Sequence, residues 1–139
     1  MSNKFEQISL KPGFMKHNGG ILFKTISENE YHFKTIIKEN HLNAAGITHG
    51  GFIATVIDAG AGTAAHRVAD QNPCVTISLE IKFISQVKLG QELVGKTKIQ
   101  KKTKSMVFLT CELTVGNKIV ATASGVWKIL KLTDAGPGG

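Results

Sequence analysis

The sequence predicts a single α+β domain in which an antiparallel sheet wraps around one long central helix. The chain has 139 residues, which gives one domain large enough to bury a sizeable core. Residues 51–68 form an apolar run that contains no proline and is long enough for a helix. Two β-type runs precede it and four follow it, and this grouping indicates an α+β layout.

Two strands are expected before the helix. Residues 21–27 alternate loosely between apolar and polar side chains, and residues 31–38 are rich in aromatic and β-branched side chains. A polar turn at residues 28–30 separates them, so we expect a hairpin. Residues 1–18 predict only a short helix or a loop, and residues 39–50 are polar and contain glycine, which is typical of a loop.

The helix expected over residues 51–68 is apolar nearly all round, which predicts that it is buried on every side. Gly60 and Gly62 interrupt it, and each costs a helix about 1 kcal/mol relative to alanine. We therefore expect another backbone to pack closely against these two positions.

Four β-type runs are expected after the helix, at residues 74–87, 92–101, 105–115 and 118–131. Gly116 and Asn117 are a two-residue hairpin signal between the last two runs. The sheet is thus expected to hold five to six strands. We expect one domain over residues 1–139, with its core at about 20–131 and a flexible tail at 132–139.

Composition argues against several classes of protein. Apolar residues make up 42% and charged residues 19%, which is a globular balance. No stretch approaches the ~20 apolar residues that span a bilayer, and the first residues lack the apolar core of a signal peptide. We therefore expect a protein of the cytoplasm or an organelle matrix, neither secreted nor bound to a membrane.

The charge of the chain favours a small anionic partner. Net charge is +7 at pH 7, and Arg67 is the only arginine among the 17 basic residues. Because arginine is the side chain that most often hydrogen-bonds to bases in specific protein–DNA complexes, a nucleic acid partner is not expected. Lysines still suit an anionic small molecule.

The cysteines and histidines give no sign of a metal. Cys74 and Cys111 lie in apolar β-like runs and are expected to be reduced core thiols. The five histidines are too dispersed to form a ligand set by spacing alone. His66, beside Arg67 at the helix end, is expected to interact with the helix dipole, and Trp127 is expected in the core.

The most informative stretch runs from His41 to Asp58. It reads H-L-N-A-A-G-I-T-H-G-G and continues into the helix, with Asp58 two turns in. The stretch resembles the hotdog-fold thioesterases of the phenylacetate-degradation (PaaI-like) type, which carry an H-x-N-x-x-G-x-x-H-G-G loop and then a helix with an acidic residue. The similarity covers roughly residues 20–130. It implies a hotdog fold and an activity like that of the small acyl-CoA thioesterases related to thioesterase superfamily member 2.

The chemistry of these residues can also be worked out directly. His49, Gly50 and Gly51 precede the helix, so their backbone N–H groups are free donors at its positive end and can stabilise an oxyanion. Glycine there lets a thioester approach the backbone, which makes Gly51 a candidate substrate-binding residue. Asp58 lies inside an apolar helix, where an unpaired buried carboxylate is costly, so it is expected to face a pocket. It would act as a general base on water or as a nucleophile.

The spacing of these two groups predicts an oligomer. Gly50 and Asp58 are eight residues apart, about 12 Å along a helix that rises 1.5 Å per residue. One thioester carbonyl cannot lie within roughly 3 Å of both groups of the same chain. The donor and the carboxylate must come from different subunits, and the resemblance implies the same arrangement across a dimer interface. We expect a dimer or a homotetramer built as a dimer of dimers.

The resemblance implies roles for three further residues. Asn43 would place the thioester or its water, and Thr76 would orient the nucleophilic water beside the carboxylate. His49 would hydrogen-bond the loop or the acyl end. Each has a purely structural alternative: Asn43 as a turn residue, His49 as a loop donor, and Thr76 as an ordinary strand residue. Asp58 could likewise be a satisfied buried polar group.

Lys101, Lys102 and Lys104 lie at a predicted hairpin turn, and we name them the lysine turn. Coenzyme A carries phosphates that need cations, and the resemblance places this turn near the nucleotide. The alternative is a solvated turn that blunts edge pairing. No metal or cofactor is expected, because coenzyme A is part of the substrate.

The predicted function is hydrolysis of an acyl-CoA thioester to a free acid and CoA. The alternative is a non-catalytic hotdog module that binds or senses acyl-CoA, which would not need Asp58. A hotdog dehydratase is a second rival, but those enzymes use a histidine base in a different loop setting.

Overall fold

The structure is a computed structural model, and it describes residues 4–131. The tail expected at 132–139 lies outside the described residues. The elements in chain order are β1 (Glu6–Gln7), α1 (Phe14–His17), β2 (Leu22–Thr25), β3 (Glu30–Ile36), a 3₁₀ turn η1 (Glu39–His41), α2 (Gly50–Val68), β4 (Cys74–Phe83), β5 (Glu92–Lys102), β6 (Met106–Val115) and β7 (Lys118–Ile129).

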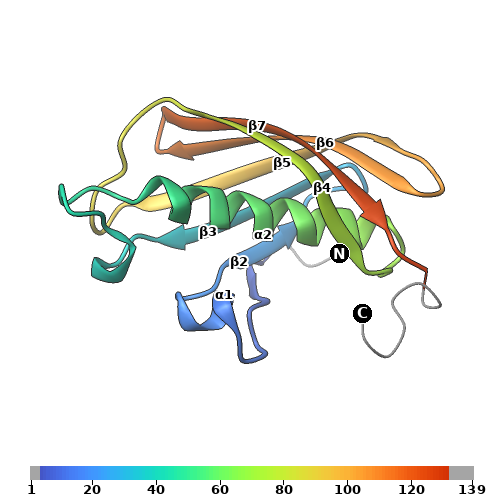
Figure 1. Cartoon of the computed structure of the whole chain (residues 1–139), viewed down its shortest axis with the longest axis horizontal. Coiled ribbons are helices and arrows are strands. Elements are labelled where there is room, and N and C mark those ends of the chain that lie inside the picture. The colour runs from blue at the N-terminus through green and yellow to red at the C-terminus, as the bar shows by residue number, and fades with distance from the viewer. Residues whose placement is uncertain (1–3, 132–139) are drawn as a thin grey trace.

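The strands form one antiparallel sheet in the order β1-β2-β3-β5-β6-β7-β4. Figure 1 shows this sheet curving over α2, with β4 beside the helix. The predicted α+β layout is confirmed. The strand count differs from the expected five to six, because residues 6–7 pair with β2 through Glu6↔Phe23. These residues belong to the segment that the sequence predicted as helix or loop.

Alternating apolar side chains hold the sheet on the helix. In β6, Val107, Leu109, Cys111 and Leu113 are buried, whereas the residues between them are not. This period of two places one face of the strand against α2. Burial raises the pKa of the Cys111 thiol to about 12 and also raises that of the half-buried Cys74 thiol. Both cysteines are free thiols, as expected.

The ring of Phe33 in β3 explains why position 60 is a glycine. The expectation that another backbone packs against Gly60 and Gly62 was wrong. The ring of Phe33 is fully buried, and a Cβ on Gly60 would lie 2.4 Å from it. A Cβ on Gly95 of β5 would lie 2.2 Å from the same ring. Gly62 faces an aromatic side chain too, since its Cβ would lie 3.3 Å from Trp127 Nε1. Rings, not another backbone, occupy the space that these glycines leave.

α2 is not buried on every side, which corrects a second expectation. One face of the helix is buried, with Ile53, Val56 and Ile57 in the core, but Gly50, Gly51 and Asp58 are exposed. The open face of α2 lies beside β4, which has no second neighbour within the described chain. Four apolar side chains on or after β4 are 46–58% exposed, namely Val75, Ile77, Phe83 and Ile84.

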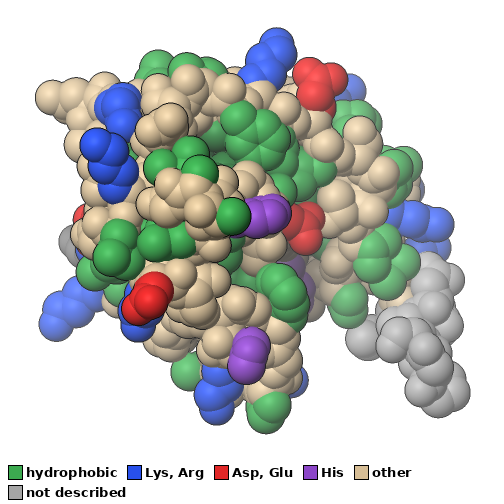
Figure 2. Space-filling model, turned by 60° about the vertical axis from the view of Figure 1, so that its left-hand side comes forward, with side chains coloured by type: hydrophobic (Ala, Val, Ile, Leu, Met, Phe, Trp, Pro, Cys, Tyr) green, Lys and Arg blue, Asp and Glu red, His purple; other side chains and the backbone are tan. Residues whose placement is uncertain are grey.

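Figure 2 shows the end of the molecule where α2 begins, with hydrophobic side chains in the middle of the view and lysines towards its outline. Exposed hydrophobic side chains that gather on one face are typical of an interaction site. No helix within residues 4–131 is both long enough and apolar enough to cross a membrane.

The C-terminal end of α2 is fixed by the residues expected there. His66 Nδ1 lies 2.7 Å from the backbone oxygen of Asn72. Arg67 donates to Thr25 Oγ1 at 3.2 Å and stacks 4.7 Å above the ring of Phe23. Trp127 is buried, as predicted.

Candidate active site

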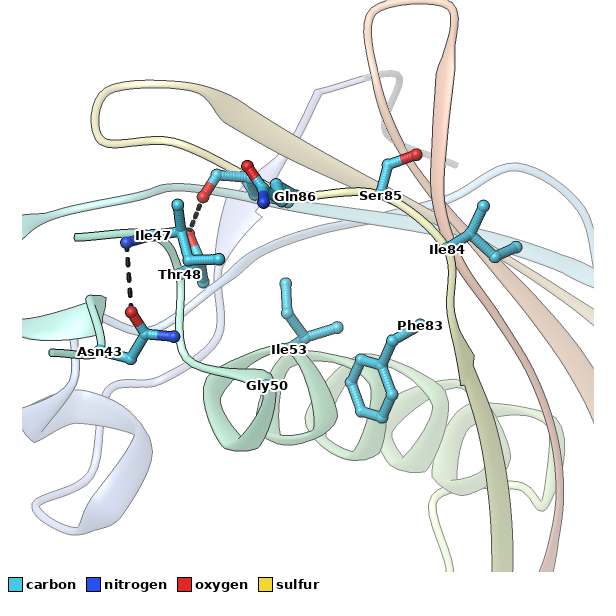
Figure 3. A pocket seen from close by; sticks show the side chains of 10 residues that line it. Asn43, Ile47, Thr48, Gly50, Ile53, Phe83, Ile84, Ser85 and Gln86 are labelled. Atoms are coloured by element: carbon cyan, nitrogen blue, oxygen red, sulfur yellow. Dashed lines mark hydrogen bonds between the residues drawn. The ribbon is translucent and has the colours of Figure 1, made fainter. Parts of the chain in front are cut away.

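The loop before α2 is shaped by Asn43. Its Oδ1 accepts from the backbone N–H groups of Ala45 at 2.9 Å and Ile47 at 3.3 Å, which supports its role as a turn residue. Its Nδ2 has no partner among residues 4–131, and Figure 3 shows it turned toward the neighbouring pocket. One half of the amide therefore builds the loop, while the other half is free to meet a ligand.

His49 caps the helix. It has an extended backbone (φ −63°, ψ 133°), and its Nδ1 accepts from Gly51 N–H at 2.8 Å. A Cβ on Gly51 would lie 2.9 Å from this ring nitrogen, so glycine makes room for the ring. The N–H of Gly51 is therefore occupied and is not the free donor that the sequence predicted. This supports a structural role for His49, although its side chain accepts from Gly51 N–H and is not the donor that the alternative expected.

Gly50 supplies the open donor. The N–H groups of Phe52 and Ile53 bond to His49 O at 2.9 and 3.2 Å, whereas Gly50 N–H has no acceptor among residues 4–131. The positive end of the helix dipole lies at the same place. Of the first N–H groups of α2, only this one can receive an oxyanion from outside the chain.

A pocket of about 330 Å³ opens beside this donor, and we name it the loop pocket. It is lined by Asn43, Ile47, Thr48, Gly50, Ile53, Phe83, Ile84, Ser85, Gln86 and Val87 (Figure 3). The ring of Phe83 lies over Gly50, at 3.7 Å from the position of a Cβ there. No sequence pattern marks Phe83 as a site residue, because it belongs to an ordinary alternation of apolar and polar side chains.

Asp58 lies in a different place. Its carboxylate is exposed, not buried as predicted, and its Oδ1 accepts from Thr76 Oγ1 at 2.7 Å. It lines a second pocket of about 430 Å³, which we name the helix pocket. The lining residues are Asp58, Ala59, Gly62, Thr63, His66, Pro73, Cys74, Thr76 and Trp127.

Thr76 reaches Asp58 through an irregularity in β4. Val75, Ile77, Leu79 and Ile81 alternate with polar residues, so a regular strand would turn Thr76 away from the core. In the β4–β7 ladder Thr76 pairs with Trp127 and Ser78 with Val126, and the register shifts between them. This bulge moves Thr76 to the helix side of the sheet. Nothing in the strand's own pattern marks it; only the resemblance pointed to Thr76.

The two halves of the predicted site do not meet within one chain. Gly50 and Asp58 lie eight residues apart in one continuous helix, about 12 Å along its axis. They line different pockets, and both lie on the open face of α2. Among residues 4–131, no group of three or more His, Cys, Asp or Glu side chains is placed to hold a metal ion.

The lysine turn lines neither pocket. Its three lysines are exposed: Lys101 and Lys102 end β5 and Lys104 lies in the turn to β6, at the end of the sheet where α2 finishes (Figure 1). Trp127 of the helix pocket pairs with Val107, five residues after Lys102. The turn therefore lies at the helix-pocket end of the sheet, opposite the loop pocket.

Fold and site together define a chain of the thioesterase class. The family model of the thioesterase superfamily matches residues 45–122, from the loop before α2 to the middle of β7. The chain therefore belongs to the thioesterase superfamily. This confirms the predicted resemblance and the thioester hydrolysis that it implied in general terms.

Two curated relatives and two solved structures agree with this. A protein of Pseudomonas aeruginosa that is named an esterase is 35% identical over 94 residues, which are 67% of this chain and 70% of the relative. Human acyl-coenzyme A thioesterase 13 is 32% identical over 78 residues, only 56% of either chain. Zebrafish thioesterase superfamily member 2 has a TM-score of 0.79 at 22% identity, with 88% of this chain and 90% of that one covered. A Streptococcus pneumoniae thioesterase protein crystallised with coenzyme A has a TM-score of 0.74 at 18% identity, covering 91% and 95%.

Proposed function

We propose that this chain hydrolyses acyl-CoA thioesters to a free carboxylic acid and CoA, at sites that two copies of the chain share. The observation that carries the proposal is the separation of an open N–H at Gly50 from the carboxylate of Asp58 on one open helix face. The loop pocket contains the oxyanion donor that thioester hydrolysis needs, and the helix pocket contains the carboxylate. A two-fold pairing with antiparallel α2 helices would bring Gly50 of one copy to Asp58 of the other, and would do so twice.

The surface of β4 supports this pairing. The strand has no second neighbour in the described chain, and it carries the exposed apolar side chains Val75 and Ile77. An unpaired strand edge with apolar side chains is a natural place for a second copy to bind. The single domain would then act as a dimer, or as a dimer of dimers.

In the proposed reaction Asp58 is the general base. Thr76 donates to Oδ1 and leaves Oδ2 free to accept a proton from water. The water oxygen bonds to the carbonyl carbon, and the carbonyl electrons move to its oxygen, which Gly50 N–H of the partner subunit stabilises. The C–S bond then breaks, and the proton held by Asp58 passes to the sulfur. Direct attack by Asp58 is the alternative, with an anhydride that water cleaves.

Three lines support CoA as the thiol. One curated relative is named an acyl-CoA thioesterase, and one structural neighbour was crystallised with coenzyme A. The lysine turn offers exposed cations at the helix-pocket end of the sheet, where the phosphates could be held. Asn43 Nδ2 and Gly51 are the further groups that would contact substrate. No metal or other cofactor takes part in the proposed reaction.

The test is thiol release from short, medium, long and aryl acyl-CoAs, compared between the native chain and Asp58→Asn. We expect Asp58→Asn to fold normally and to lose at least ~100-fold in kcat, the low end for general-base catalysis. Binding of acyl-CoA without turnover by the native chain would favour the binding module instead. Native turnover in a folded Asp58→Asn chain would refute the role of Asp58.

A further inference from the structure

Trp127 carries an indole N–H that the fold leaves without an acceptor. The side chain is only 1% exposed, yet none of residues 4–131 accepts from its Nε1. Buried tryptophan N–H groups usually find a partner, because leaving one unpaired is costly. The hydroxyl of Thr97 is the one described side-chain polar atom that is both fully enclosed and unpaired. The indole nitrogen is therefore not enclosed, and it opens toward the helix pocket that Trp127 lines.

Gly62 keeps this N–H uncovered. A Cβ at Gly62 would lie 3.3 Å from Trp127 Nε1, closer than an ordinary van der Waals contact. Gly62 has an ordinary helical backbone, so nothing in its own conformation requires glycine, and it costs the helix about 1 kcal/mol relative to alanine. Its effect on the pocket is to expose a hydrogen-bond donor.

The rest of the helix pocket suits a neutral, polar group. His66 Nδ1 faces the carbonyl oxygen of Asn72, so Nδ1 carries the proton in this bond and Nε2 has no partner among residues 4–131. Thr63 has already donated to Ala59 O at 2.8 Å. The lining contains no lysine or arginine, so this pocket offers no cation to a phosphate.

We propose that the helix pocket holds the acyl group of the substrate, and that Trp127 selects acyl groups that carry a keto or hydroxyl oxygen. This proposal rests on the proposed function. Gly62 lies four residues beyond Asp58, about 6 Å along the helix and on the side away from Gly50. An acyl chain that leaves the reacting carbon and follows the helix reaches the indole N–H at that distance. An oxygen there accepts the hydrogen bond, whereas a plain alkyl chain covers the donor and leaves it unpaired.

The test compares two acyl-CoAs of similar shape, 5-oxohexanoyl-CoA and 5-methylhexanoyl-CoA, by their kcat/KM values. We expect the native chain to prefer the keto substrate by roughly 3- to 10-fold, the effect of one hydrogen bond. Trp127→Phe keeps an aromatic side chain but removes the N–H and should abolish the preference. Gly62→Ala retains the indole but places a methyl group against its Nε1, so it should also reduce the preference, while its better helix propensity protects the fold.

Trp127 is the only tryptophan of the chain, so its fluorescence gives a second measurement. In the slow Asp58→Asn background, saturating 5-oxohexanoyl-CoA should shift the emission, and 5-methylhexanoyl-CoA should not. Equal shifts from both substrates would contradict a hydrogen bond to the keto oxygen.

The outcomes separate this proposal from the proposed function. No hydrolysis of any acyl-CoA by the native chain would refute both. Hydrolysis with equal kcat/KM for the two substrates, or a preference that survives in Trp127→Phe, would refute selection by Trp127 alone. A different result would be that Trp127→Phe lowers kcat/KM equally for both acyl-CoAs and leaves kcat/KM unchanged for the matching N-acetylcysteamine thioesters. That result would overturn the assignment of the acyl group to this pocket, because the N–H would then bind the pantetheine arm of CoA.

Discussion

Proline at position 50 would remove one backbone donor and little else. Gly50 is the first residue of α2, where proline is favoured, and its N–H has no acceptor among residues 4–131 that the change would leave unpaired. His49 already has the extended backbone that a residue before proline needs, at φ −63° and ψ 133°. The added Cβ would lie 3.7 Å from the ring of Phe83, an ordinary contact. We therefore expect Gly50→Pro to fold with native or slightly higher stability.

The catalytic effect of Gly50→Pro should be large. Loss of one oxyanion donor typically costs about 10²- to 10³-fold in kcat. Gly50→Ala adds the same Cβ at 3.7 Å from Phe83 but keeps the N–H, so it is the matched control and should lose much less. Thiol release gives kcat for both variants, and thermal unfolding at one protein concentration checks the fold. If Gly50→Pro turns over as fast as Gly50→Ala, the N–H of Gly50 does not stabilise the oxyanion.

The same variant tests the shared site. When Gly50→Pro chains are mixed equally with Asp58→Asn chains, random exchange makes half of the dimers mixed, and each mixed dimer has one intact site of two. About a quarter of the native activity should return, because the symmetry of a dimer gives two equivalent sites. If mixing recovers no activity although the subunits exchange, both groups act within one chain and the proposed pairing is refuted.

Three further changes have defined outcomes. Gly60→Ala would place a methyl group 2.4 Å from the ring of Phe33, so it should lower the free energy of unfolding, measured in urea, by about 1–3 kcal/mol. Adding Phe33→Leu should recover part of this stability. An unchanged free energy of unfolding in Gly60→Ala would contradict the contact. Replacing the three lysines of the lysine turn by glutamines should raise KM for acyl-CoA and leave kcat nearly unchanged. The same change should leave KM and kcat for an N-acetylcysteamine thioester unchanged. An unchanged KM for acyl-CoA would mean that CoA is held elsewhere. Burial raises the pKa of Cys111 from 9.0 to about 12, so the unfolded chain loses this proton first and stability should fall between those pH values. In Cys111→Ala that fall should be shallower, and identical slopes would exclude the thiol as its cause.

The main elements could be predicted because their patterns are local. The apolar, proline-free run gave α2 to within one residue of its start, since Gly50 is the first helical residue. The hairpin signal at Gly116 and Asn117 separates β6 from β7. β1 was missed because two residues carry no periodicity, and only their pairing with β2 makes them a strand.

The site was predicted less completely, because its geometry depends on contacts between residues that are far apart in the sequence. Asp58 was expected to be buried because its helix is apolar, but the open face of α2 leaves it exposed next to Thr76. The bulge at Ile77 cannot be read from a strand that alternates perfectly. The acceptor of Gly51 N–H depends on the rotamer of His49, and the unpaired indole of Trp127 depends on what surrounds it. Neither follows from residue type.

The ring of Phe33 also fixes the position of α2 along the sheet. It lies between Gly60 of the helix and Gly95 of β5, where a Cβ on either would come within 2.4 Å of the ring. A slide of α2 by about one turn would bring Val56 or Ala64 to this point, and the Cβ of either residue would collide with the ring. The ring therefore opposes a shift of the helix to the next turn. Since Asp58 lies two residues before Gly60, a contact on the buried side of α2 sets the alignment of Asp58 with Thr76 on the open side.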